Sequence, residues 1–443
     1  MTVNLRARWL NLLHTLWFLP TLIGAGYVAL ALGLVHLDAT LKPRAIVFSG
    51  SAQAARTVLQ TIADALITTA GLTFSVTMVV LQLASTQFSP RVLRNFLGDR
   101  IAQLTIGAFV GIFAYCLVAL RSIGASGVAH VPVPRLTVTV ASVLALLALV
   151  LLVVFIHHFA SMIQASELTS SLGGETKDAI DVLYPEPFAD PGEEDPADIV
   201  ARWRGAVRGG IVRAEHGGFV QSIDLDALES RLPDRRPRLH VLVAPGDFVG
   251  GDEPIAEVWP EEARDDVREA LSEAMSIAGE RDIGQDAHFG VRQLVDIALK
   301  AISPAMNDPT TAATCLGYLR AALVALAGRD MPSGVRRPDG GEPIVVRRRA
   351  FGEYLDTLAE IGRYANGDAR VVRDLLGTLQ RVAESARAAG AEARSLDVLG
   401  VAEAVAEQAL DEARSGRDRA LVEAALERVE QALIPAARPE PHR

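Results

Sequence analysis

Long apolar segments alternate with short polar ones over the first 164 residues, and four of them are long enough to cross a membrane. A hydrocarbon core about 30 Å thick requires about 20 consecutive apolar residues in a helix. The pattern predicts transmembrane helices over approximately residues 11–35, 62–84, 101–120 and 136–159. The fourth segment is almost entirely Leu, Val and Ala, so it lacks the polar face that a helix in water needs. We therefore expect residues 1–164 to form a membrane domain.

The second apolar segment differs from the others because polar residues recur along it. Their spacings of three, four and seven place them on or near one side of a helix. These candidate pore-lining residues are Asp64, Thr68, Gly71, Ser75, Gln82 and Ser85. A carboxylate in a membrane span is costly, so it normally faces protein or water. The stripe favours a water-filled route, and the alternative is close packing against another helix.

The rest of the chain reads as a water-exposed region of mixed structure. A polar connector is expected over 165–206, and alternating runs punctuated by Gly, Pro and Asp predict a small β-module over 207–259. Helical periodicity then predicts a helical domain over 260–437, interrupted by a loop at 330–349. The expected fold is an α-helical integral membrane domain of four transmembrane helices, followed by a cytoplasmic α+β region. That region combines a small β-barrel-like module with a helical bundle.

Charge separates the two halves and suggests an orientation. Residues 1–164 hold 10 Lys and Arg against 3 Asp and Glu, whereas the remaining residues hold 33 against 50. A nucleic-acid binder with a broadly basic surface is excluded, so no nucleic-acid partner is expected. Basic residues in short loops favour the cytoplasmic side. Arg6, Arg8, Arg91, Arg94 and Arg100 are assigned to that side, and the bias is weak because the other loops carry Lys42, Arg44, Arg56, Arg121 and Arg135. We expect a multi-pass protein of the inner membrane whose N-terminus and C-terminal domain are cytoplasmic.

The segment from Glu280 to Thr311 concentrates more reactive side chains than its neighbours. Asp308 before Pro309 is typical of a helix N-cap, and free N–H groups there can hold an anion while nearby carboxylates can hold a cation. The candidate ligand residues are Arg281, Gln285, Asp286, Arg292, Asp296, Asn307 and Asp308. The alternative is a well-capped turn with no ligand, beside a helix whose Arg292, Asp296 and Lys300 form structural ion pairs.

No familiar catalytic or cofactor motif occurs in the sequence. Walker, GxGxxG, GxSxG, HExxH and CxxC patterns are absent, so we expect neither an enzyme nor a bound cofactor. Cys116 and Cys315 have no ligand spacing, and His157 and His158 have no Cys or carboxylate at metal-ligand spacing, so no metal site is predicted. A membrane enzyme using Asp286 or His288 is the least favoured class.

Two passages resemble a known family: ADALITTAGLTFSVTMVVLQLASTQFSPRVLRNFLGDR at 63–100 and QDAHFGVRQLVDIALKAISPAMNDPTTA at 285–312. They look like the bacterial family of predicted membrane proteins catalogued as domain of unknown function 2254, and the similarity extends over roughly residues 5–435. FIHHFASMIQ at 155–164 fits as well. The resemblance implies an integral inner-membrane protein with a cytoplasmic tail, and it implies no particular activity or substrate.

Two classes of function follow from these features. The favoured hypothesis is a homo-oligomeric channel- or transporter-like protein in the lipid bilayer, with the cytoplasmic region as assembly platform and gate. The acidic region would then favour cations. The alternative is a membrane-tethered sensor or scaffold that binds a small ligand or a protein partner through its cytoplasmic domain. The sequence does not identify the ion or the ligand.

Overall fold

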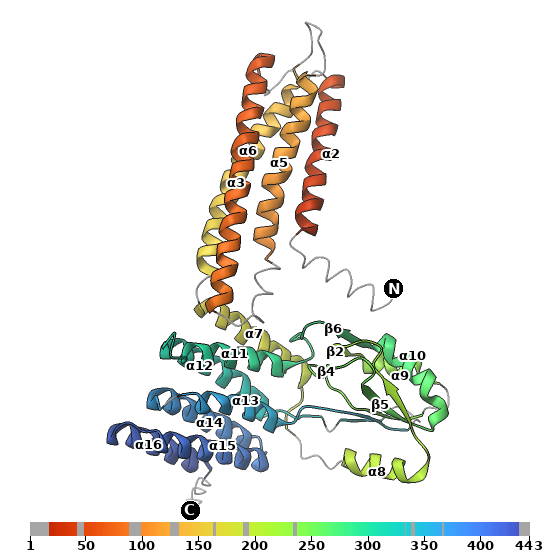
Figure 1. Cartoon of the computed structure of the whole chain (residues 1–443), viewed down its shortest axis with the longest axis vertical. Coiled ribbons are helices and arrows are strands. Elements are labelled where there is room, and N and C mark those ends of the chain that lie inside the picture. The colour runs from red at the N-terminus through yellow and green to blue at the C-terminus, as the bar shows by residue number, and fades with distance from the viewer. Residues whose placement is uncertain are drawn as a thin grey trace, which may run out of the picture. The chain divides into compact units, whose positions relative to one another are not determined.

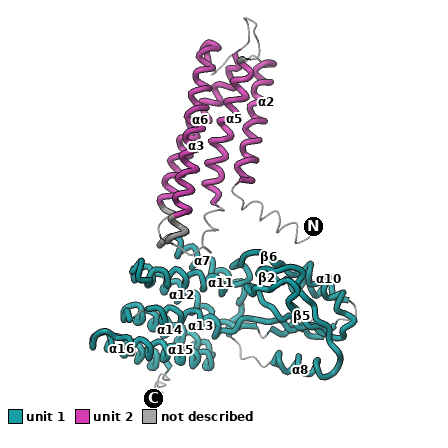
Figure 2. The backbone as a smooth tube through the Cα atoms, in the orientation of Figure 1, with its two compact units in different colours: residues 1–4, 165–443 teal, residues 5–164 magenta. Residues whose placement is uncertain are grey.

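Two compact units make up the chain, and they divide after residue 164 (Figure 2). The membrane unit contains Leu5–Gln164, and the α+β unit contains Ala165–Arg443. This computed structural model describes residues 17–41, 48–87, 99–124, 133–162, 165–188, 195–233, 237–332, 334–337, 342–365 and 367–433. Within these ranges, no side chain is described at 41, 83–87, 124, 161, 162 and 165–167.

In the described part of the membrane unit, four long helices lie side by side (Figure 1). They are α2 (Phe18–Leu41), α3 (Ala52–Gln87), α5 (Arg100–Gly124) and α6 (Arg135–Met162). Each covers one of the expected spans, although the first begins later than predicted, and what precedes it lies outside the described residues. The 36 residues of α3 extend about 54 Å, well beyond the roughly 30 Å of a hydrocarbon core.

Small residues allow α2 and α5 to pack closely. Gly107 and Gly111 are four residues apart on the face of α5 that contacts α2. A Cβ atom at Gly107 would lie 2.9 Å from the Pro20 Cα, and one at Gly111 would collide with the Tyr27 ring. This spacing of glycines is a common way for membrane helices to approach each other, because van der Waals contact is then the main attraction.

The strands of the α+β unit form two sheets. Their bounds are β1 (Gly210–Arg213), β2 (Gly218–Ile223), β3 (Arg238–Val241), β4 (Phe248–Val249), β5 (Pro254–Trp259), β6 (Met275–Ala278), β7 (Val335–Arg336) and β8 (Ile344–Val346). One sheet has the order β1-β5-β3-β8-β7 and the other β4-β2-β6. β8, from the loop expected at 330–349, pairs in parallel with β3. The module therefore consists of two sheets and includes strands from outside the expected 207–259.

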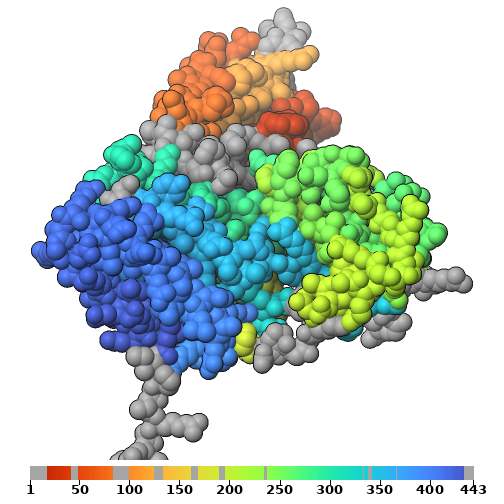
Figure 3. Space-filling model, turned by 60° about the horizontal axis from the view of Figure 1, so that its bottom comes forward, coloured from red at the N-terminus to blue at the C-terminus, as the bar shows by residue number. Residues whose placement is uncertain are grey.

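Helices form the rest of this unit. They are α7 (Ala165–Leu183), α8 (Pro196–Ala206), α9 (Leu225–Arg231), the short 3-10 helix η2 (Glu261–Ala263), α10 (Arg264–Ala274), α11 (Ala287–Ala301), α12 (Pro309–Ala327), α13 (Phe351–Arg363), α14 (Ala369–Ala388), α15 (Glu392–Asp411) and α16 (Gly416–Leu433). Two of them occupy the expected connector, and α7 packs against α11 and α12. Figure 3 shows α14 to α16 in blue and the β-module in green on opposite sides of one face of this unit.

Among the described residues, five helices are long and apolar enough to span a membrane: α2, α3, α5, α6 and α12. The fifth belongs to the α+β unit, where α7, α11 and α14 pack around it. Its side chains at Cys315, Leu319, Leu323 and Leu326 are fully buried there. Packing within a helical bundle thus accounts for the apolar character of α12.

Candidate functional site

The membrane unit contains three acidic residues, Asp38, Asp64 and Asp99, and two of them stabilise helix ends. At the end of α2, the buried Asp38 carboxylate accepts hydrogen bonds from the Thr137 N–H at 2.8 Å and its hydroxyl at 2.7 Å, in the first turn of α6. Before α5, Asp99 accepts from the Ala102 N–H at 2.7 Å and lies 2.7 Å from Nε2 of His158. Both carboxylates therefore satisfy N–H groups that helices leave unpaired.

The third acid, Asp64, is exposed on α3. Its carboxylate has no hydrogen-bond or ion-pair partner among the described residues, and only its backbone carbonyl is used, by the Thr68 hydroxyl at 2.8 Å. A charged side chain in a membrane span is costly when it faces lipid. Asp64 therefore requires water, or a polar partner other than the described residues.

Asp64 belongs to a polar face that points away from the rest of the membrane unit. Thr68, Gly71, Ser75 and Gln82 are also exposed, whereas the side chain of Ser85 lies outside the described residues. The buried face of α3, which packs on α5 and α6, consists of Ala55, Leu59, Ala63, Leu66, Ala70, Thr73, Thr77 and Val80. At 3.6 residues per turn, the polar face lies roughly 150° around the helix from this buried row. The polar residues are thus not used for packing within the chain.

Apolar side chains border the polar face on both sides. Ile67 and Phe74 are exposed on one side, and Leu72 and Val76 on the other. A helix with this profile is suited to a position where its flanks contact lipid or neighbouring helices while the strip between them contacts water.

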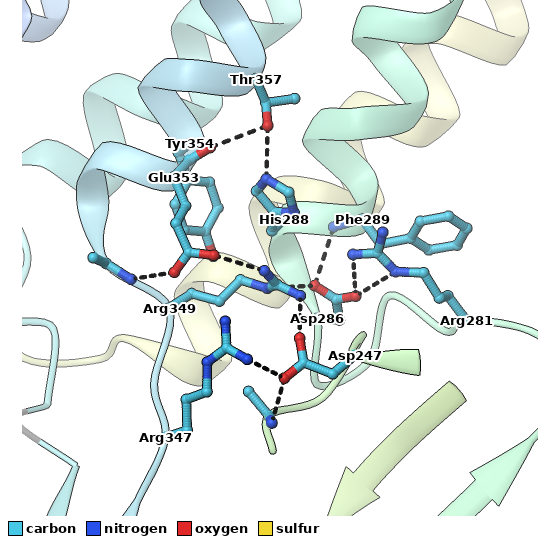
Figure 4. Close-up of polar contacts among 12 residues, drawn as sticks. Asp247, Arg281, Asp286, His288, Phe289, Arg347, Arg349, Glu353, Tyr354 and Thr357 are labelled. Atoms are coloured by element: carbon cyan, nitrogen blue, oxygen red, sulfur yellow. Dashed lines mark hydrogen bonds and ion pairs between the residues drawn. The ribbon is translucent and has the colours of Figure 1, made fainter. Parts of the chain in front are cut away.

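In the α+β unit, polar contacts concentrate around Arg349 (Figure 4). Its guanidinium donates to Glu353 at 2.8 Å and to Asp247 at 3.2 Å, and its Nε lies 3.7 Å from the Asp286 carboxylate. Burial lowers the pKa of Arg349, but the three carboxylates outweigh burial and raise the pKa overall. Asp247 follows β3, Asp286 precedes α11, and Glu353 lies on α13, so the arginine joins the β-module to the helical bundle.

Asp286 is the most buried acid of this cluster and the N-cap of α11. It accepts from the Phe289 N–H at 3.2 Å and pairs with Arg281 at 2.6 Å. Burial raises the pKa of Asp286, while Arg281 and Arg349 act in the opposite direction. Gly246, at φ +93°, lies against this pair, and any Cβ there would collide with the carboxylate. The position therefore requires glycine on both conformational and steric grounds.

His288 completes the cluster on the side of α13. Because the Thr357 hydroxyl donates to the Glu353 carbonyl at 3.0 Å, it accepts the hydrogen bond from Nε2 of His288 at 2.8 Å. Burial, with the nearby charge of Arg349 and Arg281, lowers the pKa of His288 to about 4. The ring is therefore neutral at physiological pH. Its Nδ1 is buried and has no hydrogen-bond partner among the described residues.

The ligand residues expected from the sequence do not form one site. Arg281, Gln285 and Asp286 lie before α11, where the Gln285 amide oxygen accepts from the Ile223 N–H at 3.0 Å. Asn307 and Asp308 follow the other end of this helix, whose 15 residues span about 22 Å.

Between the two ends of α11, the guanidinium of Arg292 forms two ion pairs. It pairs with Asp296 and, across to α13, with Glu360, both at 2.6 Å. This arrangement extends the predicted helix-surface pair into a bridge between two helices of the bundle.

The turn at Asn307 and Asp308 has the geometry of a helix cap. The Asp308 carboxylate accepts from the N–H groups of Thr310 and Thr311 at 3.1 Å and from the Thr311 hydroxyl at 2.6 Å. The predicted N-cap is thus confirmed, with Pro309 in the first turn. Asn307 adopts φ 48°, as asparagine does more readily than most residues. Because both carboxylate oxygens serve the cap, the turn matches the alternative without a ligand.

Sequence reasoning missed the residues that connect distant segments: Asp38, Asp99, Asp247, Arg349 and Glu353. A local signal was present for one of them, since Arg349 ends a run of three arginines directly after an apolar strand. The described residues contain no group of three or more His, Cys, Asp or Glu arranged to hold a metal ion.

Four long apolar helices with a separate, acidic α+β unit define a helical membrane protein. The chain belongs to the family described as predicted membrane protein (DUF2254), whose model matches residues 14–381. It is similar to uncharacterized proteins of Mycobacterium tuberculosis H37Rv and Mycobacterium bovis, each 33% identical over 384 residues, which cover 83% of this chain and 72% of the relative. No solved structure matches the chain.

Proposed function

We propose that this protein is a homo-oligomeric channel of the inner membrane, in which the α3 helices of several copies surround an aqueous route. The observation that carries the proposal is the exposed carboxylate of Asp64, which has no partner among the described residues and lies on the polar face of α3. A single copy would present that face to lipid, at a high cost for the charge. Copies that turn their polar faces toward a common axis remove this cost and bring several carboxylates together. Such a ring favours cations.

The same proposal assigns four membrane spans and an orientation. α12 stays in the α+β unit because its apolar face is covered by other helices. We assign Arg6, Arg8 and Arg100 to the cytoplasmic side, as in the sequence-based expectation, and with four spans the α+β unit is then on that side too. That unit then serves as assembly platform and gate, and its role is not catalytic.

Ion flux into liposomes tests the proposal. Purified protein reconstituted at a known ratio should carry K⁺, and Asp64→Asn should reduce this flux or its preference for K⁺ over Cl⁻. Leu72→Ala is the matched control, because it alters an exposed residue of the same helix outside the polar face. A monomeric protein by native mass spectrometry, or equal selectivity in wild type and Asp64→Asn, would contradict the proposal.

A second candidate function, ligand sensing by the α+β unit, rests on a groove between α13 and α15. The groove has a volume of about 600 Å³, within the range typical of small-molecule sites. Its lining includes the buried Leu355, Ala359 and Val405 and the carboxylates of Asp356 and Asp397. A thermal-shift screen would favour this function if a compound stabilised wild type but not Ala359→Trp, which fills the groove. Failure of every compound would leave the channel proposal as the better supported one.

A further inference from the structure

The polar face of α3 has one apolar turn in its described part. Successive turns present Asp64, Thr68, Gly71 and Ser75, and the polar series resumes at Gln82. Between Ser75 and Gln82, the two side chains nearest to this face are Met78, which is 50% exposed, and Val79, which is 52% exposed. They lie on either side of the midline of the face, at roughly 50° each by helical periodicity.

The apolar turn is short along the helix, as expected for a barrier to ions in a pore. Ser75 and Gln82 are seven residues apart, so about 10 Å separates them along the helix, and the apolar turn occupies the middle 5 Å. In a ring of α3 helices, Met78 and Val79 from every copy would meet at one level. An apolar constriction of this kind closes a pore by dewetting, without any physical plug.

We propose that Met78 and Val79 form the barrier inside the channel: an apolar collar that stops ions between an outer chamber lined by Asp64 to Ser75 and an inner chamber at Gln82. This inference rests on the proposed function. Methionine suits the position because its unbranched thioether changes conformation at little cost. A modest outward displacement of the α3 helices then widens the collar and lets water connect the two chambers.

Polar substitutions of matched shape test the collar. Val79→Thr keeps the shape of the side chain and adds a hydroxyl, and Met78→Gln keeps the length and adds an amide. Each should raise resting K⁺ flux in liposomes by about tenfold or more, because a wetted constriction conducts. Val76→Thr is the matched control: the same change on the same helix, at an exposed position roughly 115° from the polar face. Its flux should equal that of wild type.

Cysteine accessibility provides an independent readout. Both native cysteines, Cys116 and Cys315, are fully buried. A thiol reagent should therefore react with an introduced, exposed cysteine and not with the native ones. A membrane-impermeant thiosulfonate should modify Ser75→Cys from the outer side only and Gln82→Cys from the inner side only. Equal modification of both from one side in the resting protein would overturn the collar.

The outcomes separate this inference from the function on which it rests. If wild type, Val79→Thr and Met78→Gln all fail to carry ions, the channel proposal itself fails. If wild type carries a flux that depends on Asp64, while Val79→Thr behaves like Val76→Thr, the channel stands and the collar is wrong.

Discussion

The two units of this protein handle charged side chains in opposite ways. In the α+β unit, the carboxylates of Asp247, Asp286 and Glu353 are drawn together around one arginine, so burial is compensated by pairing. In the membrane unit, two acids cap helices while Asp64 is exposed on the outside of the described helices and its carboxylate has no partner among the residues that the structure describes. A paired charge is explained by the architecture of its own chain. A charged side chain without a described partner in a membrane helix indicates contact with water or with another molecule.

The strongest test of this comparison removes the central arginine of the α+β unit. Arg349→Ala should lower the free energy of unfolding by about 3–5 kcal/mol, because it removes the cation that Asp247, Asp286 and Glu353 share between the β-module and the bundle. Arg381→Ala is the control, since that residue forms an exposed surface pair with Glu384, and its effect should stay below about 1 kcal/mol. Denaturant unfolding in detergent measures both. Equal effects would show that the Arg349 cluster is not a structural link.

Acid should weaken the same cluster through His288. Its pKa is about 4 in the folded protein, below the ordinary value of 6.5, so the unfolded chain binds more protons between these pH values. The contribution of neutral His288 to the free energy of unfolding is therefore fully present above pH 6.5. The free energy of unfolding falls by up to about 3 kcal/mol as the pH drops toward 4. His288→Gln should flatten this part of the curve of melting temperature against pH. Parallel curves for wild type and variant would show that His288 is not buried as described.

Within the membrane unit, the Asp38 carboxylate has hydrogen-bond partners whereas that of Asp64 has none among the described residues, so the two acids can be compared directly. Asp38→Ala removes the cap of α6 and should lower the stability of the protein in detergent by about 1–2 kcal/mol. Asp64→Ala breaks no contact among the described residues and should leave the melting temperature unchanged while altering ion flux. If Asp64→Ala destabilised the protein as much as Asp38→Ala, Asp64 would have to be reclassified as a structural residue.

The smallest expected effect concerns the turn at Asp308. Asp308→Ala should cost about 1 kcal/mol through loss of the α12 cap, and Asp308→Ser should recover most of it because serine also caps well. Hydrogen bonds from Thr311 lower the pKa of Asp308, so the contribution of its charge is present at neutral pH and lost as the pH falls through the folded pKa. A loss of stability with serine as large as with alanine would argue for a role other than capping.

Local features were predictable because they depend on residues a few positions apart. The apolar runs located four helices, and the Asp308–Pro309 pair located the start of α12. The cluster around Arg349 was not predictable. Its partners lie 4, 63 and 102 residues away in the chain. The periodicity of a helix or strand does not relate residues that are 63 or 102 positions apart.

The sequence by itself determined that the polar residues of α3 share one side of a helix, since 3.6 residues per turn fixes their relative directions. Only the tertiary structure decided that this side points outward. That choice depends on which row of α3 fits α5, and the row of Ala63, Leu66 and Ala70 packs against its buried residues Phe109 and Ile112. Complementary packing between segments distant in sequence is a property of the fold, and it left Asp64 facing away from its own chain.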